Sequence, residues 1–522
     1  MGTEKRKKSK TGDKVAGNDS TQESCEANER RNLVPEDGTS RKHLFRFKTF
    51  SGVRYIIIAI ACIGMTLING MRTNIGFTVL TILDEKAHQK LGTIKAITSL
   101  PNVDWNSKMV GFLHSSFYIG YILTHMPAGY LATYLPSYRI FAGSILLSCA
   151  LNLLLPACIN ADEYYLTCLV RFLQGLVEGS LYPGCYGVLR YWSTPSERGR
   201  AGSTVLTGAY AGAVVGFPVA GVITHYIGWQ YVFYLNGCVG ILWALIWLVL
   251  AREKPSDHPF ISENELKYMT KEQGYDVTDS KETKIPIKEI LTCPAVLCLC
   301  LCHFARNWVF ILMLTNEPYY LSLFNFTVAE NGLYASIPHI MKVLTAASSG
   351  YIADYLLLDN LLTITHIRKL LTGVGFGVGC IGFFILTFVK DGSIVLIFLT
   401  LAVGFTGFAV SGWQINHYDL SARHASLLVA ITSTVGNIGS VTVPLVTGYI
   451  TFYHTLESWS IVFYITSSVL GVAVITFLIF GSGQQQSWSN PPDKVLLVQQ
   501  LDPLEAPPYK AERLQDSIKP TS

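Results

Sequence analysis

The chain has 522 residues, of which half are hydrophobic and only 15% are charged, with a formal net charge of +4. Soluble proteins carry about a quarter charged residues, so this composition excludes an ordinary soluble domain. The small net charge gives no indication of a nucleic-acid partner, and none is expected.

Apolar windows of about 20 residues recur along the chain, and this is the length that crosses about 30 Å of hydrocarbon as a helix. Six lie in the first half, at about 54–80, 109–132, 139–159, 163–189, 201–226 and 230–251. Six follow in the second half, at about 294–321, 331–354, 367–389, 393–418, 424–452 and 459–481. A backbone in lipid must satisfy its own hydrogen bonds and the alternation of a barrel strand is missing, so all twelve are predicted to be helices.

The predicted fold is therefore an all-α membrane protein with twelve transmembrane helices. The expected parts are a disordered cytosolic tail (1–50), a six-helix half (51–251), a cytosolic linker (252–292), a second six-helix half (293–481) and a cytosolic tail (482–522). Basic residues gather in the loops after segments 2, 4, 8 and 10, whereas most opposite loops hold few, the first being an exception. The positive-inside tendency then places both termini in the cytosol.

The two halves share sequence patterns. The motif GYLATY that starts at Gly129 recurs as GYIADY at Gly350, six segments later. Pro218 and Pro444 lie among glycines in the two corresponding segments 5 and 11. These repeats indicate two parallel halves, with the substrate between them near the middle of the bilayer and rocking of the halves giving alternating access.

Three arginines, Arg72, Arg171 and Arg306, lie inside apolar stretches. A guanidinium stays charged, and its burial in a membrane costs several kcal/mol or more. Glu178 can neutralise one arginine but not three, and buried charges are normally paired. The excess charge predicts a bound anion, and arginine favours a carboxylate or phosphate because it donates two parallel hydrogen bonds.

Other polar residues follow the same helices. Tyr182 shares the predicted face of Arg171 and Glu178, and Tyr121 lies on a polar stripe with His114. We therefore predict that Arg72, Arg171, Arg306, Tyr121 and Tyr182 bind substrate. His114 and Glu178 are the candidate proton-sensing or coupling residues, since imidazole titrates near vesicular and cytosolic pH; a histidine satisfied in the core fits His114 equally well.

Lys342, three residues after His339, is a fourth cation within a predicted span. Two interpretations stay open for it: it joins the anion site, or it reaches the membrane interface.

Cys298, Cys300 and Cys302 splay around a helix and are interpreted as small buried hydrophobes, so no metal site and no cofactor are expected.

The arginine-bearing segments resemble the anion-transporter family of the major facilitator superfamily, which includes vesicular glutamate transporters, sialin and type I phosphate transporters. The similarity runs from residue 54 to about 490 and rests on motifs such as VGFLHSSFYIGYILTHMPAGYLA, VRFLQGLVEGSLYP and HFARNWVF. It is greatest to the vesicular glutamate branch. Tyr186 and Lys342 depart from the family pattern, which has histidine and an apolar residue at these positions.

The resemblance implies that Arg72, Arg171 and Glu178 belong to the family's site, that His114 is linked to proton dependence, and that Arg306 is typical of the glutamate branch. It also implies uptake of L-glutamate into vesicles, driven by membrane potential and regulated by chloride and protons. The expected localisation is a vesicle membrane, with the plasma membrane as an alternative, and the expected state in the lipid is a monomer.

Three further hypotheses stay open. The first is a proton-coupled exporter of sialic acid or another acidic solute, and the second is a sodium-linked phosphate transporter. The third is a chloride channel or a transporter-like receptor that does not cycle a substrate. The chain contains no P-loop, zinc signature or nucleophile elbow, so an enzyme is not expected.

Overall fold

The computed structural model describes residues 52–83, 103, 105–132, 134–194, 197–273, 286–359, 361–421 and 424–489. All regular secondary structure in these ranges is helical. The predicted tail at 1–50 lies outside the described residues, and so do residues 490–522 of the second tail.

The helices follow the predicted order, and every predicted span corresponds to one helix or to a broken one. The first half contains α2 (Val53–Met71), α3 (Asn74–Leu83), α5 (Ser107–Leu131), α6 (Ser137–Asn160), α7 (Tyr164–Glu178), α8 (Leu181–Trp192), α9 (Arg198–Tyr226) and α10 (Trp229–Leu250). The linker contains η2 (Pro255–Asp257), α11 (Glu263–Gln273) and α12 (Ile287–Thr292). The second half contains α13 (Pro294–Ser322), α14 (Val328–Leu358), α15 (Ile364–Leu386), α16 (Gly392–Phe405), the π-helical η3 (Val410–Gln414), α17 (Asn416–Leu420), α18 (Ala425–Ile450), η4 (Thr451–Tyr453) and α19 (Leu456–Phe480), and η5 (Ser487–Ser489) follows it.

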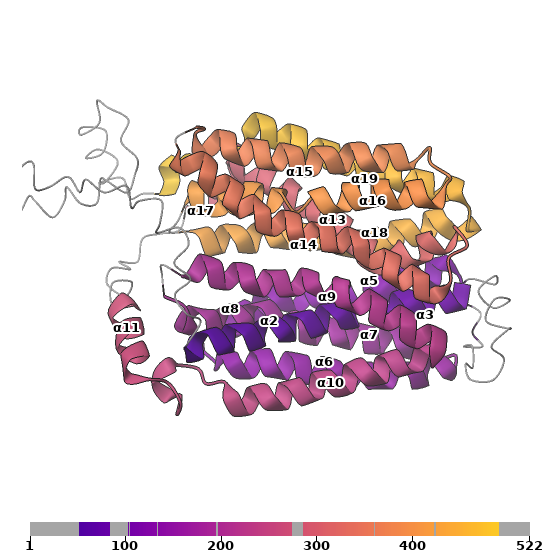
Figure 1. Cartoon of the computed structure of the whole chain (residues 1–522), viewed down its shortest axis with the longest axis horizontal. Coiled ribbons are helices and arrows are strands. Elements are labelled where there is room, and N and C mark those ends of the chain that lie inside the picture. The colour runs from indigo at the N-terminus through magenta and orange to yellow at the C-terminus, as the bar shows by residue number, and fades with distance from the viewer. Residues whose placement is uncertain are drawn as a thin grey trace, which may run out of the picture. The chain divides into compact units, whose positions relative to one another are not determined.

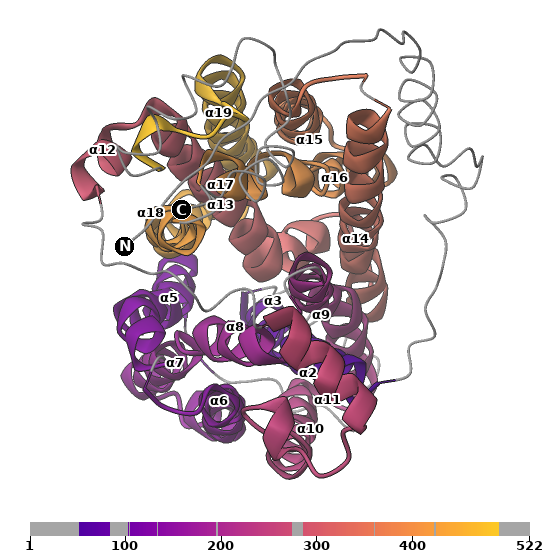
Figure 2. The ribbon, with the colours of Figure 1, turned by 90° about the vertical axis from the view of Figure 1, so that its left-hand side faces the viewer.

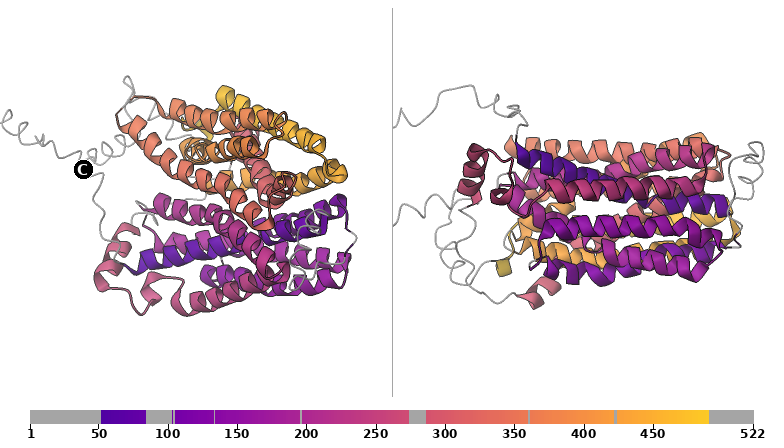
Figure 3. Two further views of the ribbon diagram at one scale, coloured as in Figure 1. Left: turned by 45° about the vertical axis from the view of Figure 1, so that its right-hand side comes forward. Right: turned by 90° about the horizontal axis from the view of Figure 1, so that it is seen from below.

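The two sets of six spans form two bundles that lie side by side. Figure 1 shows α2 to α10 in indigo to magenta on one side and α13 to α19 in orange to yellow on the other, and the end-on view in Figure 2 shows the same separation. Figure 3 shows that the helices of both bundles run roughly along one direction, as parallel membrane spans do. The bundles contact each other mainly through α5 with α18, α9 with α14, and α3 with α13.

Within the described residues, nine helical stretches are long and apolar enough to cross a membrane. The three other predicted spans are α5, the pair α7 and α8, and α14. α7 and α8 have 15 and 12 residues, so neither reaches the 17 or so residues of a span alone. α5 and α14 carry buried polar side chains, among them His114, His339 and Lys342, which lower their hydropathy. These helices therefore supply much of the polar interior.

Three spans are interrupted: the first between α2 and α3, the fourth between α7 and α8, and the tenth between α16 and α17. In the first and fourth spans, a hydroxyl side chain at the break donates to a carbonyl group three residues earlier. The predicted span at 163–189 is present, but a turn at Gly179 and Ser180 divides it into α7 and α8. The Ser180 hydroxyl donates to the Val177 carbonyl at 2.8 Å, and the Thr73 hydroxyl between α2 and α3 donates to the Gly70 carbonyl at 2.7 Å. Such bonds compete with the helical ladder. They leave Arg72 and Glu178 at the ends of helical segments.

Hydrogen bonds connect the linker to the start of the first span. The Glu265 carboxylate of α11 accepts the backbone N–H groups of Val53 and Arg54 at 3.0 and 3.2 Å. Ser262 accepts the Glu265 backbone N–H at 3.2 Å, as a helix cap does. The carboxylate thereby satisfies two of the backbone donors that open α2.

Backbones of the two bundles touch at one end of the membrane region, where α5 and α14 begin and α9 and α18 end. A Cβ on Gly448 of α18 would lie 3.0 Å from Cα of Gly111 in α5, and one on Gly221 of α9 would lie 2.8 Å from Cα of Gly332 in α14. Each pair leaves no room for side chains, so the structure is closed at this end. Alternating access requires these contacts to open.

We expect Gly332→Leu to prevent this closure, because a side chain at residue 332 meets the backbone of α9. Labelling of a cysteine introduced at Ser107, near the same end, by a membrane-impermeant maleimide should then increase, and transport should fall at least about tenfold. Gly143→Leu in α6 is the matched control, since nothing lies within 4 Å of its added Cβ. Equal labelling in the two variants would contradict the interpretation.

Candidate functional site

Arg72 and Glu178 form a buried ion pair at the ends of α2 and α7. Nε and Nη2 of Arg72 both donate to Oε2 of Glu178, at 2.9 and 2.7 Å, while the Ser148 hydroxyl of α6 donates to Oε1 at 2.5 Å. Arg72 is 6% exposed and Glu178 is fully buried. Glu178 thus forms its hydrogen-bonded ion pair with Arg72, and it interacts with Arg171 only through longer-range electrostatics.

Arg171 has no carboxylate partner among the described residues. Its Nη1 donates to Oε1 of Gln174 at 2.9 Å, and its buried Nε has no hydrogen-bond partner. Its guanidinium lies 4.6 Å from the centroid of the Phe117 ring, and the guanidinium of Arg72 lies 5.2 Å from the same ring. The aromatic face offsets a small part of the cost of burying these charges, on the order of 1 kcal/mol. Arg171 therefore carries an unbalanced positive charge.

Arg306 of α13 joins the two halves. Its Nη1 donates to Oδ1 of Asn307 at 2.7 Å, and its Nη2 donates to the hydroxyl oxygen of Tyr210, in α9 of the other half, at 3.3 Å. Its Nε is buried without a hydrogen-bond partner. Asn307 is held in turn by Asn437 of α18, with 3.2 Å between Nδ2 and Oδ1. Neutral partners surround this guanidinium in the described part of the chain.

Tyr121 and Tyr182 lie within electrostatic reach of both Arg72 and Arg306. The guanidinium of Arg72 is also 5.7 Å from the centroid of the Tyr121 ring. The two tyrosines come from α5 and α8, so the phenols connect the arginine of the first span with that of the seventh.

His114 of α5 is 1% exposed, and neither ring nitrogen has a hydrogen-bond partner in the structure. The charged group that interacts with it is Arg171. No described protein group therefore satisfies the two ring nitrogens of His114, and its role stays a prediction. All seven predicted site residues belong to one connected interior region.

The sequence interpretation missed several members of this region. Gln174, Ser148 and Tyr210 orient the predicted arginines and Glu178, and no spacing pattern distinguishes them from ordinary helix residues. Glu317 was also missed, although a carboxylate within an apolar stretch is a detectable signal. Glu317 of α13 accepts from or donates to His339 of α14, with 3.0 Å between Oε2 and Nε2, and both side chains are almost fully buried.

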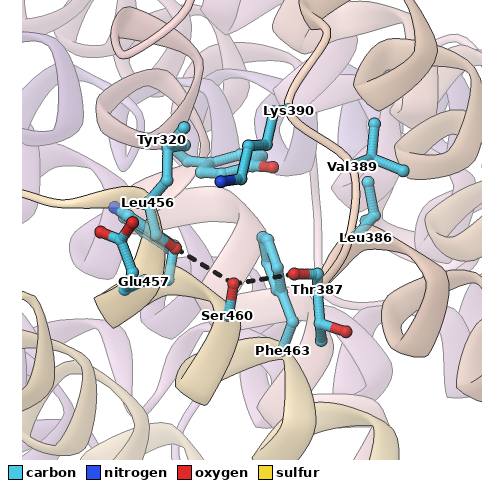
Figure 4. Close-up of a pocket in the computed structure, with 10 residues that line it drawn as sticks. Tyr320, Leu386, Thr387, Val389, Lys390, Leu456, Glu457, Ser460 and Phe463 are labelled. Atoms are coloured by element: carbon cyan, nitrogen blue, oxygen red, sulfur yellow. Dashed lines mark hydrogen bonds between the residues drawn. The ribbon is translucent and has the colours of Figure 1, made fainter.

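A small pocket of about 160 Å³ lies elsewhere, where α13, α15 and α19 meet. Figure 4 shows the Ser460 hydroxyl in its wall, hydrogen-bonded to the carbonyl groups of Thr387 and Leu456. Lys390 and Glu457 also line it. None of the seven predicted site residues lines this pocket, so it is separate from the arginine region.

Comparison with known proteins shows the family to which the chain belongs. The model of the Major Facilitator Superfamily matches residues 49–425. The chain belongs to this superfamily. Vesicular glutamate transporter 2.2 of Danio rerio is 36% identical over 442 residues, which are 84% of this chain and 75% of that protein. Vesicular glutamate transporter 2 of Homo sapiens is 34% identical over the same shares of the two chains.

Solved structures of the superfamily share the fold at low sequence identity. A bacterial homolog of the human lysosomal transporter Spinster, inward-facing and occupied, has a TM-score of 0.61 at 14% identity, covering 82% of this chain and 96% of its own. A D-xylose–proton symporter has a TM-score of 0.60 at 15% identity, covering 82% and 99%. The predicted fold of two six-helix halves and the family resemblance are therefore confirmed, and the protein is a multi-pass membrane transporter.

The ion pair of Arg72 and Glu178 yields a stability prediction. Glu178→Gln leaves a buried guanidinium without its counter-charge, which costs about 3–5 kcal/mol. We expect a clearly lower melting temperature of the purified protein in detergent, with partial recovery in the double variant Arg72→Gln/Glu178→Gln. Glu163→Gln, on an exposed carboxylate at the start of α7, is the control. An unchanged melting temperature in Glu178→Gln would contradict the pairing.

Proposed function

We propose that this protein transports a small organic anion with carboxylate groups, of which L-glutamate is the first candidate, by alternating access between its two halves. One observation carries the proposal: the interior contains Arg171 and Arg306 without carboxylate partners in the described residues. Buried charges of this kind need an anion to compensate them. The transported solute is the natural source of that anion.

The positions of the groups suit a carboxylate substrate. Arg171 comes from the first half and Arg306 from the second, so an anion held by both contacts both moving bodies. Each guanidinium has a buried Nε–H without a partner, which is a free donor for a carboxylate oxygen. Tyr121 and Tyr182 add hydroxyl groups between Arg72 and Arg306. The names of the similar vesicular glutamate transporters support L-glutamate as the substrate.

We also propose which parts of the protein move, in which membrane it lies and what drives transport. The bodies that move are residues 51–251 and 293–481, joined by the linker 252–292, with cytosolic tails at 1–50 and 482–522. The expected membrane is that of an intracellular vesicle, with both termini in the cytosol. A membrane potential that is positive inside the vesicle draws the anion inward, while chloride and protons modulate transport, and the protein acts as a monomer.

A proton-coupled exporter of an acidic solute is the second candidate. The buried pair of Glu317 and His339 favours it, because such a pair can take up and release a proton inside the membrane. This candidate predicts transport that follows a pH gradient rather than a potential.

Arg306→Ala should abolish uptake, because it removes a donor that only α13 supplies. We would measure radiolabelled L-glutamate uptake into proteoliposomes with an imposed inside-positive potential and no pH gradient. Loss of at least about 100-fold is expected for a charged hydrogen-bonding group. Arg139→Ala, at an exposed arginine near the start of α6, is the surface control. Concentrative uptake that survives in Arg306→Ala would overturn the proposal, and uptake that appears only with a proton gradient would favour the second candidate.

His114 yields a pH prediction. Burial and the neighbouring Arg171 both oppose a protonated imidazole in the empty protein, whereas a bound anion favours it. Proton uptake at His114 should therefore accompany binding, so wild-type affinity for L-glutamate should rise as the pH falls. We expect His114→Gln to retain uptake but to lose most of this dependence, as measured by apparent KM between about pH 5.5 and 7.5. His366→Gln, at an exposed helix start, is the control. An unchanged pH profile in His114→Gln would exclude His114 as the sensor.

A further inference from the structure

Lys342 of α14 is buried inside the protein rather than extended to the membrane interface. It is 3% exposed, so the interpretation in which it reaches the interface is wrong. Among the described residues no ion pair and no hydrogen bond of its ammonium occurs. His339, one turn earlier on α14, interacts with Glu317, and that carboxylate does not contact the ammonium. A lysine in this position is costly unless something anionic accompanies it.

Lys342 lies against the same aromatic pair as Arg306. Its Nζ is 4.9 Å from the ring centroid of Tyr210 and 5.2 Å from that of Phe310. The guanidinium carbon of Arg306 is 5.7 and 5.0 Å from the same two centroids. The rings themselves meet edge to face at 5.9 Å. Two cations therefore gather around one pair of rings from α9 and α13.

Cation–π contacts do not remove the repulsion between these two charges. They compensate only a part of the cost of burying a cation, and they do so for each cation separately. The ammonium has three donors, and the unpartnered Nε–H of Arg306 is a fourth. These donors belong to two positive charges that have no counter-ion, so the site is suited to bind an acidic group.

We propose that Arg306 and Lys342 form a second anion subsite, which binds the distal carboxylate of a dianionic dicarboxylate. The inference rests on the proposed function and narrows its substrate class. Arg171, Arg306 and Lys342 lack carboxylate partners in the described residues, so a substrate of charge −2 compensates more of this excess than L-glutamate, whose net charge is −1. The protein should therefore accept dicarboxylates without an amino group and bind them more tightly.

The test compares three acids with the same five-carbon chain: glutarate, L-glutamate and pentanoate. Binding to the full-length purified protein is measured as the ligand-induced shift of its thermal unfolding, first in chloride-free buffer. We expect wild type to bind glutarate about tenfold more tightly than L-glutamate. Lys342→Met should weaken glutarate binding by at least about tenfold and change pentanoate binding less than about threefold, as expected for the loss of one charged contact.

Two variants and one further measurement distinguish a binding role of Lys342 from a merely structural role. Lys342→Arg keeps the charge and should retain the preference for glutarate. Lys390→Met, at an exposed lysine, should behave as wild type. Without ligand, Lys342→Met should unfold at a higher temperature than wild type, because it removes an uncompensated buried charge. A lower melting temperature together with equal losses for all three acids would show a merely structural role and overturn the inference.

The remaining outcomes are also distinct. If wild type binds L-glutamate and glutarate equally well, the inferred preference for a dianion is wrong and the inference is overturned, while the proposed function stands. If chloride alone stabilises wild type but not Lys342→Met, and glutarate does not compete with it, the subsite binds chloride and the dicarboxylate inference is overturned. If wild type binds none of the three acids, the proposed function itself fails, and the inference fails with it.

Discussion

The compensation of buried positive charge is the constraint on which the interior of this protein depends. A charged side chain in a membrane interior needs a counter-charge, a hydrogen-bond network or a ligand. Glu178 supplies the counter-charge for Arg72 alone, through two hydrogen bonds to one carboxylate oxygen. The other arginines and Lys342 have neutral partners or aromatic faces. The excess is arranged around the contact between the two halves, where a transported solute must pass.

The helix interruptions explain how the paired charges reach each other. Thr73 and Ser180 divert their hydroxyl groups to carbonyl groups three residues earlier, which interrupts the first and fourth spans at the level of the site. Arg72 and Glu178 stand at these interruptions. The same device lets α8 begin anew at Leu181, so that Tyr182 is positioned independently of Arg171. Thr73 and Ser180 take no part in the ion pair, yet they determine where Arg72 and Glu178 lie.

Much of the fold could be predicted from the sequence, because length and hydropathy determine where a membrane helix lies. All twelve spans appear near their predicted bounds, although three are broken. The breaks were not predictable from periodicity, since a hydroxyl side chain in a helix interrupts it only in some surroundings. The partner of Glu178 could not be predicted from the sequence either. Glu178 lies seven residues from Arg171 on one predicted face, yet it binds Arg72. The reason is that the approach of α2 to α7 depends on packing between helices. Tyr210 was missed for the same reason.

The charge distribution also gives the substrate a role in the motion. The structure is closed where Gly111 meets Gly448 and Gly221 meets Gly332, and Arg306 contacts Tyr210 across the halves at another level of α9. When the opposite end closes, cations carried by α7, α13 and α14 must share a smaller space with less water, so their repulsion grows as the dielectric falls. An anion between them turns this repulsion into attraction. Under the proposed function, the empty protein therefore resists the fully closed state and the loaded protein enters it, so the solute moves without an open leak.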